Sequence, residues 1–140
     1  MLIEMNAIIA GVAGTAVMTG FVYLVSYVFK TNCKVVWVLG NMLSRKYPIP
    51  VGILAHYMIG VFFSIIYTIL WSNGVGSPTL GSGLVFGALN GLFAMGFWYS
   101  FIKLHPHPPA LNVPVYVTVI GTGHLFFSTG VVLCYNLLNA

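Results

Sequence analysis

The segment from Gly83 to Leu104, GLVFGALNGLFAMGFWYSFIKL, decides the class of fold. Its glycines recur at Gly83, Gly87 and Gly91, and a spacing of four places them on one face of a helix. Residues 83–102 carry no charge, and about 20 helical residues are enough to cross a bilayer core. In lipid, a stripe of glycines lets a second helix approach closely. The segment is therefore predicted to be the central helix of a membrane bundle.

The composition of the whole chain indicates the same class of protein. Of its 140 residues, 59% are hydrophobic and 4% are charged, whereas soluble domains carry about 25% charged residues. Five cations and one anion cannot cover a water-soluble surface, so we expect a single integral membrane domain over residues 1–140, in contact with the lipid bilayer. The net charge of +4 does not indicate a nucleic-acid partner, because no pattern of aromatic residues accompanies the cations.

The distribution of apolar residues extends the prediction to a four-helix bundle. Besides the span at about residues 83–104, we expect spans at about 6–29, 51–72 and 113–138. Between the first two spans, apolar residues from Val35 to Leu43 repeat on one helical face. They predict a short amphipathic helix at about residues 34–45, lying in the membrane interface with Trp37 as its anchor and ended by the prolines of Tyr47–Pro50. The predicted fold class is therefore an all-α membrane protein.

Small residues predict which helix faces point inward. In the first span, Ala16 and Gly20 form a pair typical of close helix packing. In the second span, small and polar residues recur every four positions, and we expect this stripe to face the bundle while bulky residues face lipid. The stripe consists of Gly52, His56, Gly60 and Ser64. Asn90, the one strongly polar residue in the middle of the third span, is expected to hydrogen-bond to a neighbouring helix.

The positions of the five cations predict the orientation of the chain. Lys30, Lys34, Arg45 and Lys46 lie between the first two spans, and Lys103 lies at the end of the third. All five are therefore on one side of the membrane, which the positive-inside rule assigns to the cytoplasm. We expect the loops at residues 30–50 and 103–112 to be cytoplasmic and both termini to lie outside.

The side chains that are missing limit the chemistry. The chain has no Asp, and its single carboxylate, Glu4, lies near the outer terminus, which disfavours a carboxylate-driven transporter. It contains no phosphate-binding glycine loop, paired zinc cysteines or HExxH motif, so we expect no catalytic activity of its own. Cys33 and Cys134 are expected at opposite membrane faces, as two free thiols.

Histidines are the remaining candidates for a functional site. His56 and His124 are expected about two to three turns into their spans from the cytoplasmic side, where two imidazoles can bind haem or a metal ion as cofactor. His105 and His107, at the end of the third span, are further candidate metal ligands. The alternative, which the sequence favours, is that each imidazole hydrogen-bonds a neighbouring group and helps to specify helix pairing.

Short motifs in three spans resemble uncharacterised families of small four-span bacterial membrane proteins. The motifs are GTAVM at residues 14–18, AHYMIG at residues 55–60 and GH at residues 123–124. The resemblance implies the same fold, two recurrent histidines and a bacterial inner membrane, and it implies no activity. In those families an acidic residue often follows the Val-Met pair. Here Thr19 takes that position, which argues against an ion-linked role.

Three classes of function are consistent with these patterns. We favour a structural or accessory subunit of a larger membrane complex, with other membrane subunits as partners. Almost no residues lie outside the membrane, and the glycine stripes indicate internal packing without a cavity. The first alternative is a redox or ligand-binding protein that uses His56 and His124. The second is a small transporter or channel, which the uncharged spans disfavour.

Overall fold

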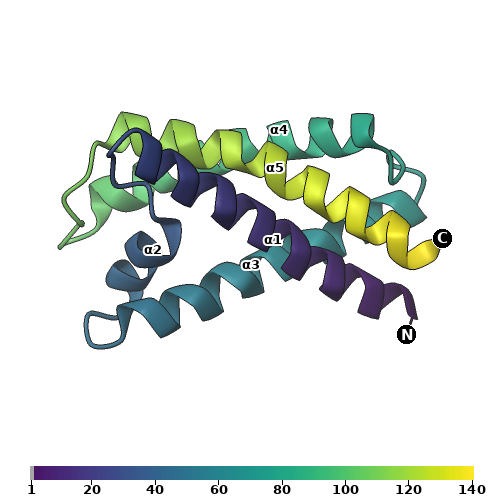
Figure 1. The fold of residues 1–140 in the computed structure, drawn as a ribbon, viewed down its shortest axis with the longest axis horizontal. Helices are drawn as coiled ribbons and strands as arrows, with labels where there is room; N and C mark the ends of the chain where they lie inside the picture. Colours follow the sequence, from purple (N-terminus) through teal and green to yellow (C-terminus); the bar gives the residue numbers. More distant parts are fainter. Residues whose placement is uncertain (1) are drawn as a thin grey trace.

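The computed structural model describes residues 2–140, and side chains from Met5 onward. Its helices are α1 (Leu2–Val28), α2 (Val35–Leu43), α3 (Pro48–Ser72), α4 (Leu80–Leu104) and α5 (Val113–Asn139) (Figure 1). No strand occurs among residues 2–140. The helices α1, α3, α4 and α5 are each long and apolar enough to cross a membrane. The prediction of an all-α fold with four long apolar helices is confirmed.

Local chemistry sets the ends of the helices. α3 begins at Pro48, earlier than predicted, because the first turn of a helix tolerates proline, which has no N–H to donate. The prediction that Tyr47–Pro50 ends the short helix was therefore wrong, since α2 already ends at Leu43 and the prolines begin α3. The side chains of Thr79 and Asn112 cap the first turns of α4 and α5 by accepting backbone N–H groups.

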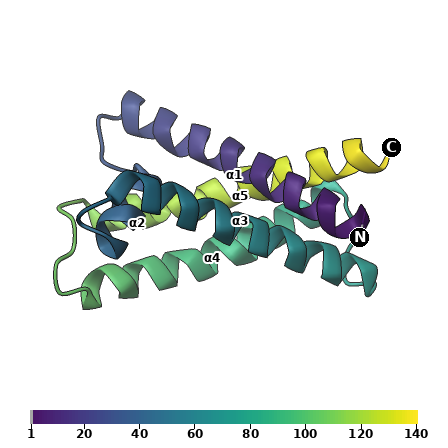
Figure 2. The same ribbon diagram turned by 90° about the horizontal axis from the view of Figure 1, so that it is seen from below.

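The four long helices form a bundle that is open on one side. α4 packs along α5, α5 along α1, and α1 along α3. Within residues 2–140, α3 and α4 make almost no backbone contact, so the row of helices does not close into a ring. The prediction that α4 is the central helix was therefore wrong, since α4 lies at one end of the row. α2 packs on α3 at one end of the molecule (Figure 1, Figure 2).

Glycines bring α4 within backbone distance of α5. A methyl group added at Gly91 would lie 2.5 Å from the carbonyl oxygen of Gly121, and one added at Gly87 would collide with Ser128. Gly83, one turn earlier, lies on the same face against α5. The glycine stripe of α4 therefore packs directly on α5, with no room for a side chain.

The small residues of α1 pack differently from the prediction. A methyl group at Gly11 would lie 2.7 Å from the backbone of α3, and one at Gly14 would lie 2.6 Å from a backbone carbonyl of α5. The predicted pair, Ala16 and Gly20, is exposed, and no described atom lies within 4 Å of a methyl group at Gly20. The prediction was wrong because α1 lies between α3 and α5, and residues 16 and 20 are on its outer face.

The inner face of α3 is the predicted stripe. Gly52, His56, Gly60 and Ser64 are all buried. The hydroxyl of Ser64 donates a hydrogen bond of 2.8 Å to the carbonyl oxygen of Ala7 in α1, and Gly60 lies directly against α1. Bulky residues cover the opposite, exposed side of the helix.

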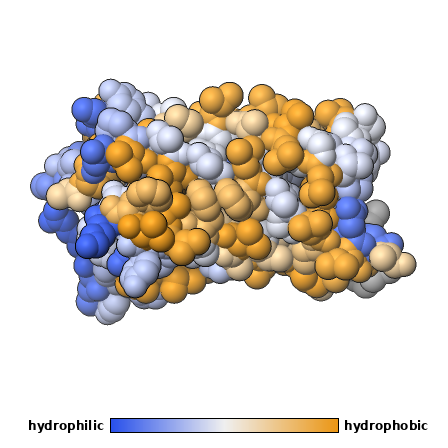
Figure 3. Space-filling model, turned by 45° about the horizontal axis from the view of Figure 1, so that its top comes forward, coloured by the Kyte–Doolittle hydropathy of each residue, from blue (hydrophilic) through white to orange (hydrophobic). Residues whose placement is uncertain are grey.

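Polar residues gather at the end of the molecule that carries α2. An apolar surface covers the middle of the visible face, and hydrophilic residues cover that end (Figure 3). Both termini lie at the opposite end (Figure 1). Such an apolar belt, with four long apolar helices beneath it, is typical of a small integral membrane protein. Cys33 and Cys134 are free thiols, as predicted.

Candidate functional site

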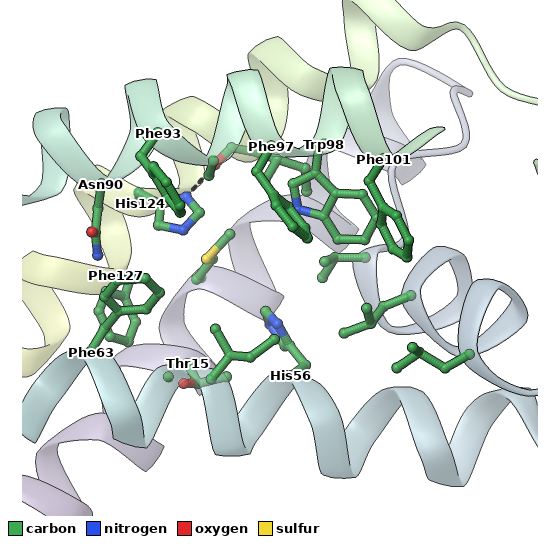
Figure 4. Close-up of a pocket in the computed structure, with 18 residues that line it drawn as sticks. Thr15, His56, Phe63, Asn90, Phe93, Phe97, Trp98, Phe101, His124 and Phe127 are labelled. Atoms are coloured by element: carbon green, nitrogen blue, oxygen red, sulfur yellow. Dashed lines mark hydrogen bonds between the residues drawn. The ribbon is translucent and has the colours of Figure 1, made fainter. Parts of the chain in front are cut away.

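A cavity of about 360 Å³ occupies the space between α3 and α4. All five helices contribute to its lining, and we call it the aromatic cavity because six aromatic side chains form much of its wall (Figure 4). These side chains are Phe63, Phe93, Phe97, Trp98, Phe101 and Phe127. Its volume lies in the range of small-molecule binding sites, about 300–1,000 Å³.

The aromatic cavity is bounded at both ends and open at its side. At the end nearer the termini, Nδ2 of Asn90 donates a hydrogen bond of 3.0 Å to the hydroxyl of Tyr67, which joins α4 to α3. At the other end, apolar residues of α2 form a floor. Between these ends, the lining residues Phe93 and Phe97 are 65% and 50% exposed. The opening therefore lies on the side of the bundle, within the apolar belt of its surface.

Two of the histidines singled out in the sequence meet at this cavity. His56 extends into it from α3 and His124 from α5 (Figure 4). His56 is buried and His124 is half-buried. The two residues are 68 positions apart in sequence, and α1 lies between their helices in the row. They line the same cavity because the row of helices is curved.

Hydrogen bonds fix which nitrogen of each ring carries the proton. Nδ1 of His124 lies 2.8 Å from the carbonyl oxygen of Ile120, which can only accept, so Nδ1 is protonated and Nε2 of the neutral ring keeps its lone pair. Nε2 of His56 lies 3.2 Å from the hydroxyl oxygen of Thr19. The proton of that hydroxyl is already donated to the carbonyl oxygen of Thr15 at 2.7 Å. Nε2 of His56 is therefore the donor, and its Nδ1 keeps the lone pair.

Both rings consequently offer a hydrogen-bond acceptor. Among the described residues, neither lone-pair nitrogen has a hydrogen-bond partner, and the side-chain oxygen of Asn90 is a third acceptor without one. No Lys, Arg, Asp or Glu of the described chain lines the cavity. The site is suited to an uncharged, mostly apolar molecule that carries hydrogen-bond donors, or to a metal-containing group that takes imidazole nitrogen.

His105 and His107 lie outside the aromatic cavity. Nε2 of His105 donates to the carbonyl oxygen of Met42 at 3.1 Å, and its Nδ1 accepts the backbone N–H of His107 at 3.1 Å. Both ring nitrogens of His105 are therefore occupied, and the ring ties the end of α4 to α2. Within the described part of the chain, no three His, Cys, Asp or Glu side chains gather as a metal site requires. Metal binding at His105 and His107 stays a prediction, and it requires these hydrogen bonds to open.

Sequence reasoning missed the contact between Thr19 and His56, and it missed the aromatic wall of the cavity. Phe93, Phe97 and Phe101 recur every four residues, which places them on one face of α4. That spacing was a usable signal, but a row of aromatic residues on a membrane helix is equally typical of a face toward lipid. Thr19 follows Thr15 by one helical turn, and its role depends on which helix lies beside it.

Comparison of the chain with protein families, with curated proteins and with solved structures finds no match. The interpretation of the site therefore depends on its own geometry.

Proposed function

We propose that this protein binds a lipid-soluble molecule inside the membrane, in the aromatic cavity between α3 and α4. The observation that carries the proposal is the pair of imidazole acceptors, Nδ1 of His56 and Nε2 of His124, at a cavity that opens sideways. A molecule dissolved in the bilayer can reach such an opening without crossing water. The sequence favoured a structural role because it indicated no cavity, and the presence of one supports ligand binding instead.

The wall and the acceptors together define the class of ligand. Aromatic side chains favour a flat ring that can stack against them. Each unpaired acceptor is satisfied by a hydroxyl or N–H group of the ligand, and a typical hydrogen bond contributes about 1 kcal/mol net. An aromatic diol such as a benzoquinol fits both requirements, whereas the oxidised quinone offers only acceptors. Haem is the alternative ligand, because a histidine whose Nδ1–H donates to a backbone carbonyl, as in His124, is typical of metal-bound imidazole.

Retention of the ligand by histidine variants tests this proposal. The protein is purified in mild detergent from its own membrane, its absorbance spectrum is recorded, and bound small molecules are extracted for mass spectrometry. Binding of an added short-chain benzoquinol is then measured for the wild type and for the His56→Leu/His124→Leu double variant. With two hydrogen bonds removed at about 1 kcal/mol each, the double variant should bind about 30-fold more weakly.

His107→Leu is the matched control, because it removes an imidazole outside the aromatic cavity. It should bind the benzoquinol like the wild type. A Soret band that disappears in His124→Leu identifies haem as the ligand in place of the quinol. A wild-type protein that carries no extractable molecule and binds no added benzoquinol contradicts the proposal.

An accessory role in a larger membrane complex, with other subunits as partners, stays a separate prediction. Native mass spectrometry in mild detergent tests it, since larger proteins should copurify with the chain and monomer alone would argue against the role. A transporter or channel is less favoured, because the Asn90–Tyr67 hydrogen bond bounds one end of the aromatic cavity and α2 bounds the other.

We also infer that the α2 end lies in the cytoplasm of a bacterial inner membrane, with both termini outside. All five cations lie in or beside the loops of that end, which the positive-inside rule assigns to the cytoplasm. An impermeant thiol reagent applied to intact cells should label Ser77→Cys and should label Lys46→Cys only after permeabilisation. The reverse labelling pattern would show that the chain has the opposite orientation in the membrane.

A further inference from the structure

A second cavity, of about 440 Å³, is shallow and open to the surface and lies between the end of α1 and the start of α2. Its lining is polar and basic, with one tryptophan, and we call it the basic cavity. The lining residues are Ser26, Lys30, Thr31, Asn32, Lys34 and Trp37. None of them lines the aromatic cavity, so the two sites are separate.

The loop that forms the basic cavity is folded back onto α1. The backbone N–H of Cys33 donates to the hydroxyl oxygen of Ser26 at 3.0 Å, and that of Thr31 donates to the carbonyl oxygen of Ser26 at 3.2 Å. Lys30 adopts a left-handed conformation with φ of 49°, which reverses the chain after α1. The side chain of Cys33 is buried beneath the loop. These contacts hold the backbone positions from which Lys30 and Lys34 extend.

Among the side chains that the structure describes, from Met5 onward, no Asp or Glu is present to neutralise these lysines. The one acidic side chain of the sequence belongs to Glu4, near the start of α1, and the 27 residues of that helix span about 40 Å. Burial raises the pKa of the Cys33 thiol, so no thiolate offsets the two ammonium groups. Among the described residues, no side chain caps the first turn of α2, whose free N–H groups add partial positive charge.

We propose that the basic cavity binds a phosphate group, and that this phosphate belongs to the headgroup of an anionic phospholipid. Two ammonium groups, the Thr31 hydroxyl, the Asn32 amide and the indole N–H of Trp37 are all donors that phosphate oxygens can accept. The site is at the end of a helix that is long and apolar enough to cross a membrane, and phospholipid headgroups surround the ends of such helices.

The surface next to the basic cavity distinguishes a lipid from a soluble phosphate. Tyr27 is 84% exposed and Phe29 is 72% exposed, and both lie in the last turn of α1 or directly after it. These apolar side chains offer a surface for acyl chains beside the headgroup site. A soluble phosphate would make no use of them. The geometry therefore favours a lipid as the source of the phosphate.

Lipid binding by charge-neutral variants tests the proposal. Native mass spectrometry in mild detergent gives the affinity for added phosphatidylglycerol. Each basic residue near a membrane surface contributes about fivefold in affinity, so Lys30→Gln/Lys34→Gln should bind about 25-fold more weakly than the wild type. Lys30→Arg/Lys34→Arg keeps both charges and should bind like the wild type. Helical content and melting temperature are recorded for each variant.

The matched control is Arg45→Gln/Lys46→Gln, which removes the same charge from the same end of the molecule but outside the basic cavity. It should retain nearly all of the affinity. An equal loss of lipid affinity in both double variants would mean that the lipid is attracted to surface charge in general. That result would contradict a specific site at the basic cavity.

Two further probes separate the sources of the phosphate. Phosphatidylcholine, which has the same phosphate but no net charge, should bind at least about tenfold more weakly than phosphatidylglycerol. Glycerol 1-phosphate at the same concentration should not displace the lipid. If it competes equally with phosphatidylglycerol, the occupant is a soluble phosphate and the assignment to a phospholipid is wrong.

Discussion

The two sides of α4 are built in opposite ways. Toward α5, glycines at every fourth position allow backbone to approach backbone, and no space remains. Toward α3, phenylalanines at every fourth position hold the two helices apart, and the aromatic cavity lies between them. Both faces are apolar and both repeat with the same period. The size of the side chains therefore decides whether a helix face becomes a packing surface or the wall of a binding site.

The largest effect is expected where α4 meets α5. In Gly91→Leu, the first side-chain atom would lie 2.5 Å from a backbone oxygen of Gly121, which cannot move without shifting α5. We expect a loss of about 3 kcal/mol in the free energy of unfolding, measured by thermal unfolding in detergent. Gly96→Leu is the matched control, since no described atom lies within 4 Å of a methyl group there. Equal melting temperatures for the two variants would contradict the close packing of the glycine face of α4 on α5.

A bulky substitution where the glycine face of α4 borders the aromatic cavity should affect binding as well as stability. Ala94 is buried and lines the aromatic cavity, so the ring in Ala94→Phe would occupy space that the ligand needs. We expect benzoquinol binding to fall at least about tenfold, and the free energy of unfolding to fall by about 1–3 kcal/mol, as is typical when a buried side chain is enlarged. Unchanged binding, measured beside the histidine variants, would show that the cavity does not hold the ligand.

The order of the helices in space explains what the sequence could and could not predict. Apolar periodicity and the absence of charge predicted the four long helices, and the stripe on α3 predicted its inner face. Gly20 on α1 and Gly87 on α4 each follow a small residue by four positions, yet Gly20 is exposed and Gly87 is packed. Whether a small residue meets a partner depends on which helices are neighbours, and no local pattern contains that information.

The order of the helices in space also explains what the sequence could not predict about the candidate site. The sequence singled out His56 and His124 and placed them at similar depth. Their convergence on one cavity depends on the gap between α3 and α4, which follows from contacts made elsewhere in the row of helices. The third acceptor, on Asn90, was predicted to join helices, and in the structure this side chain both joins α3 to α4 and lines the cavity.

A smaller effect on stability is expected when either of two tyrosine hydroxyl groups, which have contrasting surroundings, is removed. Tyr67→Phe removes the acceptor that holds Asn90 across the end of the aromatic cavity, and should reduce the free energy of unfolding by about 1 kcal/mol. The hydroxyl of Tyr116 is buried and has no hydrogen-bond partner in the described structure. Tyr116→Phe should therefore be neutral or stabilising by up to about 1 kcal/mol. Melting curves of the two variants, recorded together, should differ in sign or size, and the opposite order would contradict these hydrogen-bond assignments.

The central claim is that two imidazole acceptors line one cavity, and nitrogen NMR of ¹⁵N-histidine-labelled protein tests it most directly. The account predicts two neutral rings in opposite tautomers, with the proton on Nδ1 in His124 and on Nε2 in His56. Signals are assigned with single His→Gln variants. Added benzoquinol should shift the lone-pair nitrogen of both rings and leave His105, whose nitrogens are already bonded, unchanged. The same tautomer in both rings, or signals of His56 and His124 that do not shift when the benzoquinol is added, would contradict the account.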